Sequence, residues 1–315
     1  MNSLIIPESS SNHLETPFLQ SHEALLNRFV LFLDTSPETI TTYKKSLRQF
    51  FIYLQENNII NPRREDIIAY RDSMKKNLQS NTVQLYMVAV RLFFSWLSQE
   101  GLYPNIAFKI KGARVGNAHK RQCLTVNQLQ NLISFPRITV VEKRDYAIIL
   151  LMTTGGLRDI EISRANIEDL QVIGDNVVLY IQGKGRDEKD AFVLIPSQID
   201  DAIRDYLKER NDTFPSSPLF CSTSNNSRGN RLSTRSVSGI VKSRLITAGY
   251  DSPHLTAHSL RHSAATISML NGSTLEETQQ FLRHSNLNTT MIYLHHFNRM
   301  NNKSEERIAN AIFEK

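Results

Sequence analysis

The chain has 315 residues, of which 40% are hydrophobic and 22% charged, a composition that is typical of folded globular proteins and excludes a disordered chain. Its length exceeds that of a usual single domain and predicts two domains. The formal net charge of +6 permits an anionic partner but does not identify one.

The first part of the chain predicts a loose tail followed by a helical domain. Residues 1–21 are largely polar and interrupted by prolines, which is typical of an unstructured end. Four segments with apolar residues at helical spacing then begin near residues 22, 37, 63 and 80. Ser36 and Pro37 mark one start, since serine is a good N-cap and proline fits the first helical position. We predict a helical domain over residues 22–112.

A short basic segment follows the helical region. Residues 109–121 contain no acidic side chain and five basic ones, Lys109, Lys111, Arg114, Lys120 and Arg121. The segment contains glycine and lacks apolar periodicity, so we place a linker at residues 113–121. Such a run is either a solvated linker or a strap that lies along phosphates. These five residues are therefore our candidate DNA contacts.

The second half of the chain predicts a mixed α and β domain over residues 122–300. Two strands are expected at 176–181 and 191–195, as a β-hairpin with a polar tip between them. Helices are expected near residues 125–134, 142–153, 158–165, 197–209, 234–248, 259–271, 274–282 and 288–294. In residues 301–315, Ser304 can cap a terminal helix with Ile308 and Ile312 on one side. The predicted fold class is mainly α with a small antiparallel sheet.

The two cysteines, Cys123 and Cys221, lie far apart, which excludes a disulfide framework and a cysteine-based metal site. The longest strongly apolar run, residues 146–152, is too short to cross a bilayer, and the chain starts without a secretion signal. We therefore expect a protein of the reducing cytoplasm that has no membrane partner.

Two arginines are candidates for holding a phosphate. Arg261 lies three positions after His258 at the start of an expected helix, so both side chains share one face and can converge on an anion. Arg158 opens a helix after a Gly-Gly pair, where backbone N–H groups and a guanidinium can both face a phosphate. Glu161, one turn later, can orient that guanidinium. Taken singly, each motif is better explained as an ordinary helix-end charge or ion pair, and only their combination favours a phosphate site.

Lys184, His284 and Tyr293 add the remaining groups that phosphoryl transfer through a tyrosyl intermediate requires. Together with the arginines they supply a nucleophilic hydroxyl, guanidiniums for the non-bridging oxygens, and proton donors and acceptors. Two arginines can neutralise developing charge, and the chain offers no convincing carboxylate cluster for divalent ions. We therefore expect no metal and no other cofactor.

Five motifs follow one another along the second half of the chain, namely Gly156-Leu-Arg158-Asp-Ile-Glu161, Lys184, His258-Ser-Leu-Arg261-His262, Leu282-Arg-His284 and Tyr293. In this order and spacing they resemble the tyrosine recombinases, also called phage-integrase-type recombinases. The resemblance covers residues 22–300, because the Ser36–Tyr43 and Leu92–Leu97 segments look like that family's core-binding domain. It implies an N-terminal helical core-binding domain and a C-terminal α+β catalytic domain.

The resemblance also implies a role for each site residue. Tyr293 would attack the scissile phosphate to form a 3′-phosphotyrosine, while Arg158 and Arg261 hold the non-bridging oxygens. Lys184 would protonate the leaving 5′ oxygen. His258 would assist proton transfer around the tyrosine. Because the phosphotyrosine bond conserves the energy of the broken linkage, strand rejoining would need no ATP.

His284 would hydrogen-bond the phosphate, but its neighbour departs from the family's pattern. Similar proteins usually carry glycine before this histidine, and here Arg283 takes that position. Glycine there permits close packing or an unusual backbone angle. An arginine would either add a phosphate contact or displace His284.

The implied partner is double-stranded DNA, on which four protomers would join two recombination sites, alone or with a related recombinase. The biological task is either dimer resolution of the Xer type or integration and excision of a mobile element. Rival interpretations are a type IB topoisomerase, a non-catalytic DNA-binding protein, and a metalloprotein using His258, His262, His284, His295 and His296. The C-terminal helix would dock on its own domain or on a neighbouring protomer.

Overall fold

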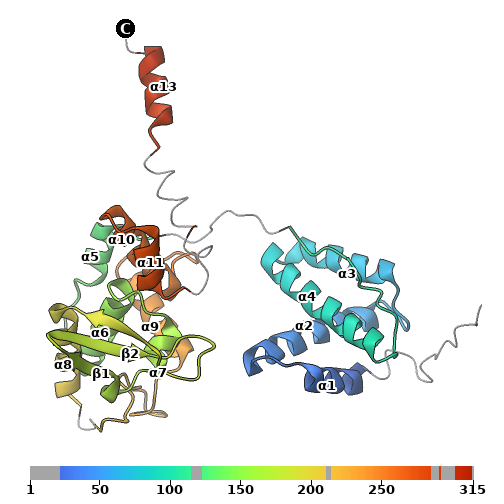
Figure 1. Cartoon of the computed structure of the whole chain (residues 1–315), viewed down its shortest axis with the longest axis horizontal. Helices are drawn as coiled ribbons and strands as arrows, with labels where there is room; N and C mark the ends of the chain where they lie inside the picture. Colours follow the sequence, from blue (N-terminus) through green and yellow to red (C-terminus); the bar gives the residue numbers. More distant parts are fainter. Residues whose placement is uncertain (1–21, 115–122, 211–213, 285–290, 292–301, 314–315) are drawn as a thin grey trace, which may run out of the picture. The chain divides into compact units, whose positions relative to one another are not determined.

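The computed structural model describes residues 22–114, 123–210, 214–284, 291 and 302–313. The chain forms two compact units, residues 1–118 and 119–315, and each has a hydrophobic core of its own. Most described residues are helical, and the sheet is small and antiparallel (Figure 1). The predicted fold class is confirmed. No helix among the described residues is long and apolar enough to span a membrane.

Within its described residues, 22–114, the N-terminal unit contains four helices, α1 (His22–Phe32), α2 (Pro37–Glu56), α3 (Arg64–Asn77) and α4 (Ser80–Gln99). The Ser36 side chain accepts a hydrogen bond from the Thr39 amide and so caps α2, with Pro37 at the first helical position. Aromatic rings fill the core, where Phe93 contacts Phe29 and Phe94 edge to face. The four starts expected from the sequence agree with these helices.

The chain that follows α4 packs back onto the same unit. Ile110 is buried in the N-terminal core. Three arginines of α3 and α4 donate hydrogen bonds to carbonyls of residues 106–111: Arg64 to Phe108 at 2.6 Å, Arg71 to Lys111 at 3.2 Å and Arg91 to Ile110 at 3.0 Å. Residues 106–111 are therefore a fixed part of this unit rather than a solvated linker.

In the described part of the second unit, the sheet has three strands in the order β1 (Leu170–Ile173), β2 (Asn176–Ile181) and β3 (Ala191–Ile195), all antiparallel. The sequence predicted β2 and β3 but missed β1, which is short and mostly exposed. A two-residue turn, Gly174-Asp175, joins β1 to β2, and Gly174 has the positive φ of 58° that such turns require. That Gly-Asp pair was the available sequence signal for a first hairpin.

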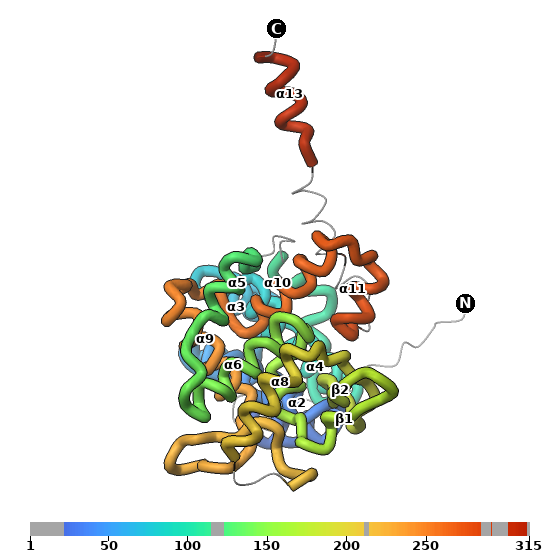
Figure 2. The backbone as a smooth tube through the Cα atoms, turned by 90° about the vertical axis from the view of Figure 1, so that its left-hand side faces the viewer, coloured from blue at the N-terminus to red at the C-terminus, as the bar shows by residue number. Residues whose placement is uncertain are grey.

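The helices of the second unit are α5 (Val126–Leu132), α6 (Val140–Thr153), α7 (Asp159–Arg164), α8 (Ser197–Lys208), α9 (Thr234–Thr247), α10 (Ala257–Leu270), α11 (Leu275–Leu282) and, near the end of the chain, α13 (Ser304–Phe313). Buried α6 lies at the centre and contacts α8, α9 and α10. Helices α10 and α11 lie side by side (Figure 1 and Figure 2). The helix expected at 288–294 falls outside the described residues, apart from Met291.

Candidate active site

A glycine turn connects α6 to α7 and brings α11 close. Gly156 has φ +59°, in the left-handed region that favours glycine. A Cβ added there would lie 2.9 Å from the Phe281 ring of α11, closer than such atoms approach. The turn therefore places Arg158, at the start of α7, next to the end of α11.

A single carboxylate anchors Arg158. Glu161 accepts hydrogen bonds from the Arg158 amide at 2.8 Å and from Arg158 Nη1 at 2.6 Å, so it both caps α7 and orients the guanidinium. The Glu161 side chain is 0% exposed, whereas that of Arg158 is 23% exposed. Burial alone would raise the pKa of Glu161, but the charges of Arg283, Arg158 and Arg261 outweigh it and lower the pKa below its ordinary value. Glu161 is therefore ionised at neutral pH.

Arg261 reaches the same place from α10. Its Nη1 donates to the Gly156 carbonyl and its Nη2 to the Leu282 carbonyl, and Nη1 lies 3.9 Å from Glu161 Oε2. The side chain is only 1% exposed. Arg261 thus links the glycine turn to the end of α11.

Arg283 also belongs to this cluster, although the sequence assigned it no such contact. It ends α11 in a left-handed conformation, with φ 53° and ψ 46°. Its Nη2 donates to Glu161 Oε2 at 3.0 Å and to the Gly156 carbonyl at 3.1 Å. The backbone angle explains why glycine suits this position, and the side chain turns into the site rather than away from it. The unusual residue at a glycine position was the only sequence signal for this role.

His284 follows Arg283 and is half-buried beside the arginines. Its amide donates to the Gln279 carbonyl at 3.1 Å, and Gln279 Nε2 donates back to the His284 carbonyl at 3.0 Å, which fixes its backbone. Burial, and then the positive charges of Arg261, Arg158 and Arg283, lower the pKa of His284 to about 4. The imidazole is therefore neutral at pH 7 and carries one N–H donor.

Lys184 lies exposed at the tip of the β2–β3 hairpin, whose two ends are both tied down. Arg164 of α7 donates to the Gly183 carbonyl at 3.0 Å. Lys189 binds both carboxylate oxygens of the buried Asp169 at 2.6 and 2.7 Å. The loop that presents Lys184 is thus anchored on each side, and the α7 anchor comes from the helix that Arg158 begins.

His258 is exposed in the first turn of α10, and its ring packs edge to face on the buried His262 at 4.7 Å between centroids. Tyr293 lies outside the described residues, as do His295 and His296. Within the described part of the chain no group of three His, Cys, Asp or Glu side chains could hold a metal ion. The structure thus brings Arg158, Arg261 and His284 together, and it leaves the placement of Tyr293 undescribed.

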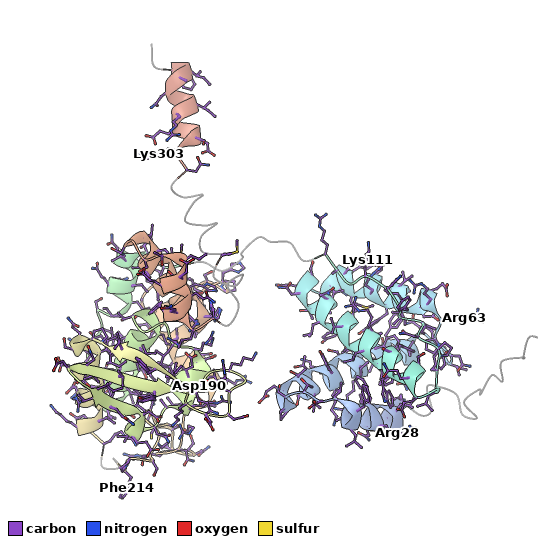
Figure 3. All side chains as sticks on the ribbon, in the orientation of Figure 1. Arg28, Arg63, Lys111, Asp190, Phe214 and Lys303 are labelled. Atoms are coloured by element: carbon purple, nitrogen blue, oxygen red, sulfur yellow. The ribbon has the colours of Figure 1, made fainter. Side chains whose placement is uncertain are left out.

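Of the five candidate DNA contacts, three lie in described residues and all three are exposed: Lys109, Lys111 and Arg114. They alternate with the buried Ile110 and Ala113, so the basic side chains point away from the N-terminal core. Figure 3 shows Lys111 extending outward from that unit. Lys120 and Arg121 lie outside the described residues.

Both units match models of known protein families. A model of the phage integrase family matches residues 122–300, and a model of the phage integrase N-terminal SAM-like domain matches residues 26–101. Tyrosine recombinase XerA of Thermococcus kodakarensis is 32% identical over 273 residues, covering 85% of this chain and 89% of its own. Tyrosine recombinase XerC of Thermodesulfovibrio yellowstonii is 30% identical over 289 residues, covering 86% and 89%.

Solved structures share the fold. The XerH site-specific recombinase bound to its difH substrate in a pre-cleavage complex has a TM-score of 0.70 at 19% identity, covering 95% of this chain and 98% of that one. A lambda integrase dimer bound to a COC′ core site has a TM-score of 0.67 at 15% identity, covering 84% and 95%.

Proposed function

Because this chain belongs to the phage integrase family and is a site-specific tyrosine recombinase, we propose that it cuts and rejoins DNA through a 3′-phosphotyrosine at Tyr293. One observation carries the assignment of the site. Arg158, Arg261 and His284 come from segments far apart in the sequence and meet around one buried carboxylate. Two fixed guanidiniums beside a neutral imidazole N–H donor are suited to a phosphodiester, whose negative charge grows during transfer.

In this mechanism Arg158 and Arg261 hold the non-bridging oxygens, and the neutral His284 donates its N–H to the phosphate. Lys184 gives a proton to the leaving 5′ oxygen, and the two anchors of its hairpin limit how far the amine can stray. His258 assists the proton transfer at Tyr293. Neither a metal nor ATP takes part.

Covalent trapping tests this proposal. Duplexes tiled across the DNA that flanks the gene, each with a nick, allow the cut end to diffuse away so that the phosphotyrosine accumulates. We expect a protein–DNA species that withstands SDS and forms equally in EDTA. Tyr293→Phe should retain DNA binding and form no such species. A covalent species with the Tyr293→Phe variant, or one that needs a divalent ion, would overturn the assignment.

The finer proposals concern DNA binding and assembly. We infer that Lys109, Lys111 and Arg114 contact phosphates, with Lys120 and Arg121 continuing the same segment. Both units would bind duplex DNA, and four protomers would join two sites in a bacterial-type cytoplasm, on the nucleoid. Counterion release predicts an affinity that falls steeply with salt, so an affinity unchanged between low and high salt would contradict the phosphate contacts.

A type IB topoisomerase activity is the alternative that shares the chemistry. The match of residues 26–101 to the family's SAM-like domain favours recombination. Relaxation of a supercoiled plasmid with no exchange between two cognate sites would reverse the choice.

A further inference from the structure

Three guanidinium groups share one carboxylate in the candidate site. Arg158 Nη1 lies 2.6 Å from Glu161 Oε1. Arg283 Nη2 lies 3.0 Å from Oε2, while Arg261 Nη1 stays 3.9 Å from the same oxygen. The carboxylate neutralises one of three positive charges. Its two oxygens therefore attract more cations than they bind at hydrogen-bond distance.

Arg283 occupies the oxygen that Arg261 would otherwise approach. A charge-assisted hydrogen bond forms at about 2.7–2.9 Å between nitrogen and oxygen, so Arg261 stands off by roughly 1 Å. Arg261 instead donates to the Gly156 and Leu282 carbonyls. Since Arg283 Nη2 also donates to the Gly156 carbonyl at 3.1 Å, both arginines are held on the glycine turn.

Arg283 makes these contacts although its backbone conformation is unfavourable. With φ at 53°, the residue adopts a conformation that L side chains rarely take and that glycine takes freely. Its side chain is only 14% exposed, and Nη1 also donates to the Phe281 carbonyl at 2.7 Å. The side chain therefore bridges the end of α11, the glycine turn and Glu161 of α7, and these contacts offset the unfavourable backbone angle.

We propose that Arg283 is a positioning residue for strand cleavage: by saturating Glu161 Oε2, it prevents Arg261 from collapsing onto Glu161 and keeps that guanidinium available for the scissile phosphate. The proposal rests on the proposed function, in which Arg158 and Arg261 hold the phosphate. Without Arg283, Arg261 would pair closely with Glu161 and turn away from the substrate. A displacement of about 1 Å at such a group is enough to slow a reaction by an order of magnitude or more.

The test is the rate of covalent-complex formation by the full chain on the nicked duplex, at protein concentrations that saturate the DNA. Arg283→Gly removes the guanidinium and suits the backbone, so the protein should stay folded. We expect it to react about tenfold more slowly than wild type. Arg283→Lys, which keeps one cation near Oε2, should recover part of the rate. Arg204→Ala is the control, because it removes an equal charge at an exposed residue of α8, and it should react like wild type.

The double variant Arg283→Gly with Glu161→Gln separates positioning from other roles. A neutral glutamine cannot draw Arg261 inward, so Arg283→Gly should lower the rate less than twofold in that background. An equal loss in both backgrounds would assign Arg283 a direct contact with DNA and overturn the proposal. A wild-type rate for Arg283→Gly would overturn it as well.

A measurement without DNA distinguishes failure of this proposal from failure of the proposed function. The imidazole resonance of His284 reports binding of inorganic phosphate to the cluster, and Arg283→Gly should weaken that binding about tenfold. If Arg283→Gly weakens phosphate binding but wild type forms no covalent complex with DNA, the positioning role stands and the strand-cleavage function is refuted. Unchanged phosphate binding, or none in wild type, would refute the positioning role.

Discussion

Replacing Glu161 by alanine should destabilise the second unit while leaving the first unchanged. The variant leaves three guanidiniums around an empty position. The side chains of Arg158, Arg283 and Arg261 are only 23%, 14% and 1% exposed, which gives them little access to water. Removing one partner of a buried ion pair costs about 3–5 kcal/mol. Arg158 and Arg283 are partly solvated and can relax outward, so we expect about 3 kcal/mol, the lower end of that range. Glu161→Gln keeps the hydrogen-bond acceptor for the Arg158 amide and should cost less.

The chain offers a built-in way to assign this loss to one unit. Its single tryptophan, Trp96, lies in the N-terminal core. Urea unfolding followed by Trp96 fluorescence should therefore match wild type, while far-UV circular dichroism shows an earlier transition for the second unit. The two transitions are fitted separately, since a two-unit chain is not two-state. The matched control is Asp251→Ala, which breaks the exposed pair with Lys242 and should cost at most about 1 kcal/mol. The reasoning would be refuted if Glu161→Ala lost no more unfolding free energy than the control. It would also be refuted if the Trp96 fluorescence transition shifted as far as the circular dichroism transition.

Three more outcomes follow from local geometry. Gly156→Ala should lower the unfolding free energy of the second unit by about 2 kcal/mol in urea, because it forces an L residue to φ +59° and sets a Cβ 2.9 Å from Phe281. An unchanged unfolding free energy would mean that the turn relaxes freely. Ser36→Ala should shift the Trp96 fluorescence transition by about 1 kcal/mol through loss of the α2 cap, with no shift if the cap is unimportant. His284 titrates near 4 when folded and near 6.5 when unfolded, so the unfolded chain binds more protons between these values and stability falls as pH falls through that window. Between pH 7 and pH 5 wild type should therefore lose about 1 kcal/mol more than His284→Gln, a figure reduced for the histidine's partial solvation, and identical pH profiles would contradict the lowered pKa.

Local signals in the sequence were sufficient for the helical elements. Ser36 and Pro37 mark the start of α2 through chemistry that acts within one turn, and apolar spacing located α4 without any tertiary information. Strand β1 was missed because four mostly exposed residues carry no alternation. Residues 106–111 were assigned to the helical domain, but the hydrogen bonds that hold them there could not be predicted, since they come from arginines 19 to 44 positions away.

In the candidate site, too, the short-range contacts could be predicted from the sequence and the long-range contacts could not. The contact between Arg158 and Glu161 spans three positions and was expected from the helix start alone. The contacts of Arg283 with Gly156 and Glu161 span 127 and 122 positions. Nothing in the local sequence predicts these contacts, so the sequence showed Arg283 only as a departure from the family's pattern. Its positive φ and its inward side chain emerged when α11 was packed against the glycine turn.

The charge balance of the cluster connects its stability to its function. Among the residues that the structure describes, three guanidiniums surround one carboxylate, and this excess of positive charge in a poorly solvated place disfavours the compact state. A protein selected for stability alone would gain from a second carboxylate there. On the proposed function, the scissile phosphate supplies that missing anion, so the repulsion that costs stability in the free protein becomes attraction for DNA. The lowered pKa of His284 fits the same account. A histidine kept neutral by burial and by three nearby arginines can offer a hydrogen bond to the phosphate without adding a fourth charge to the free site.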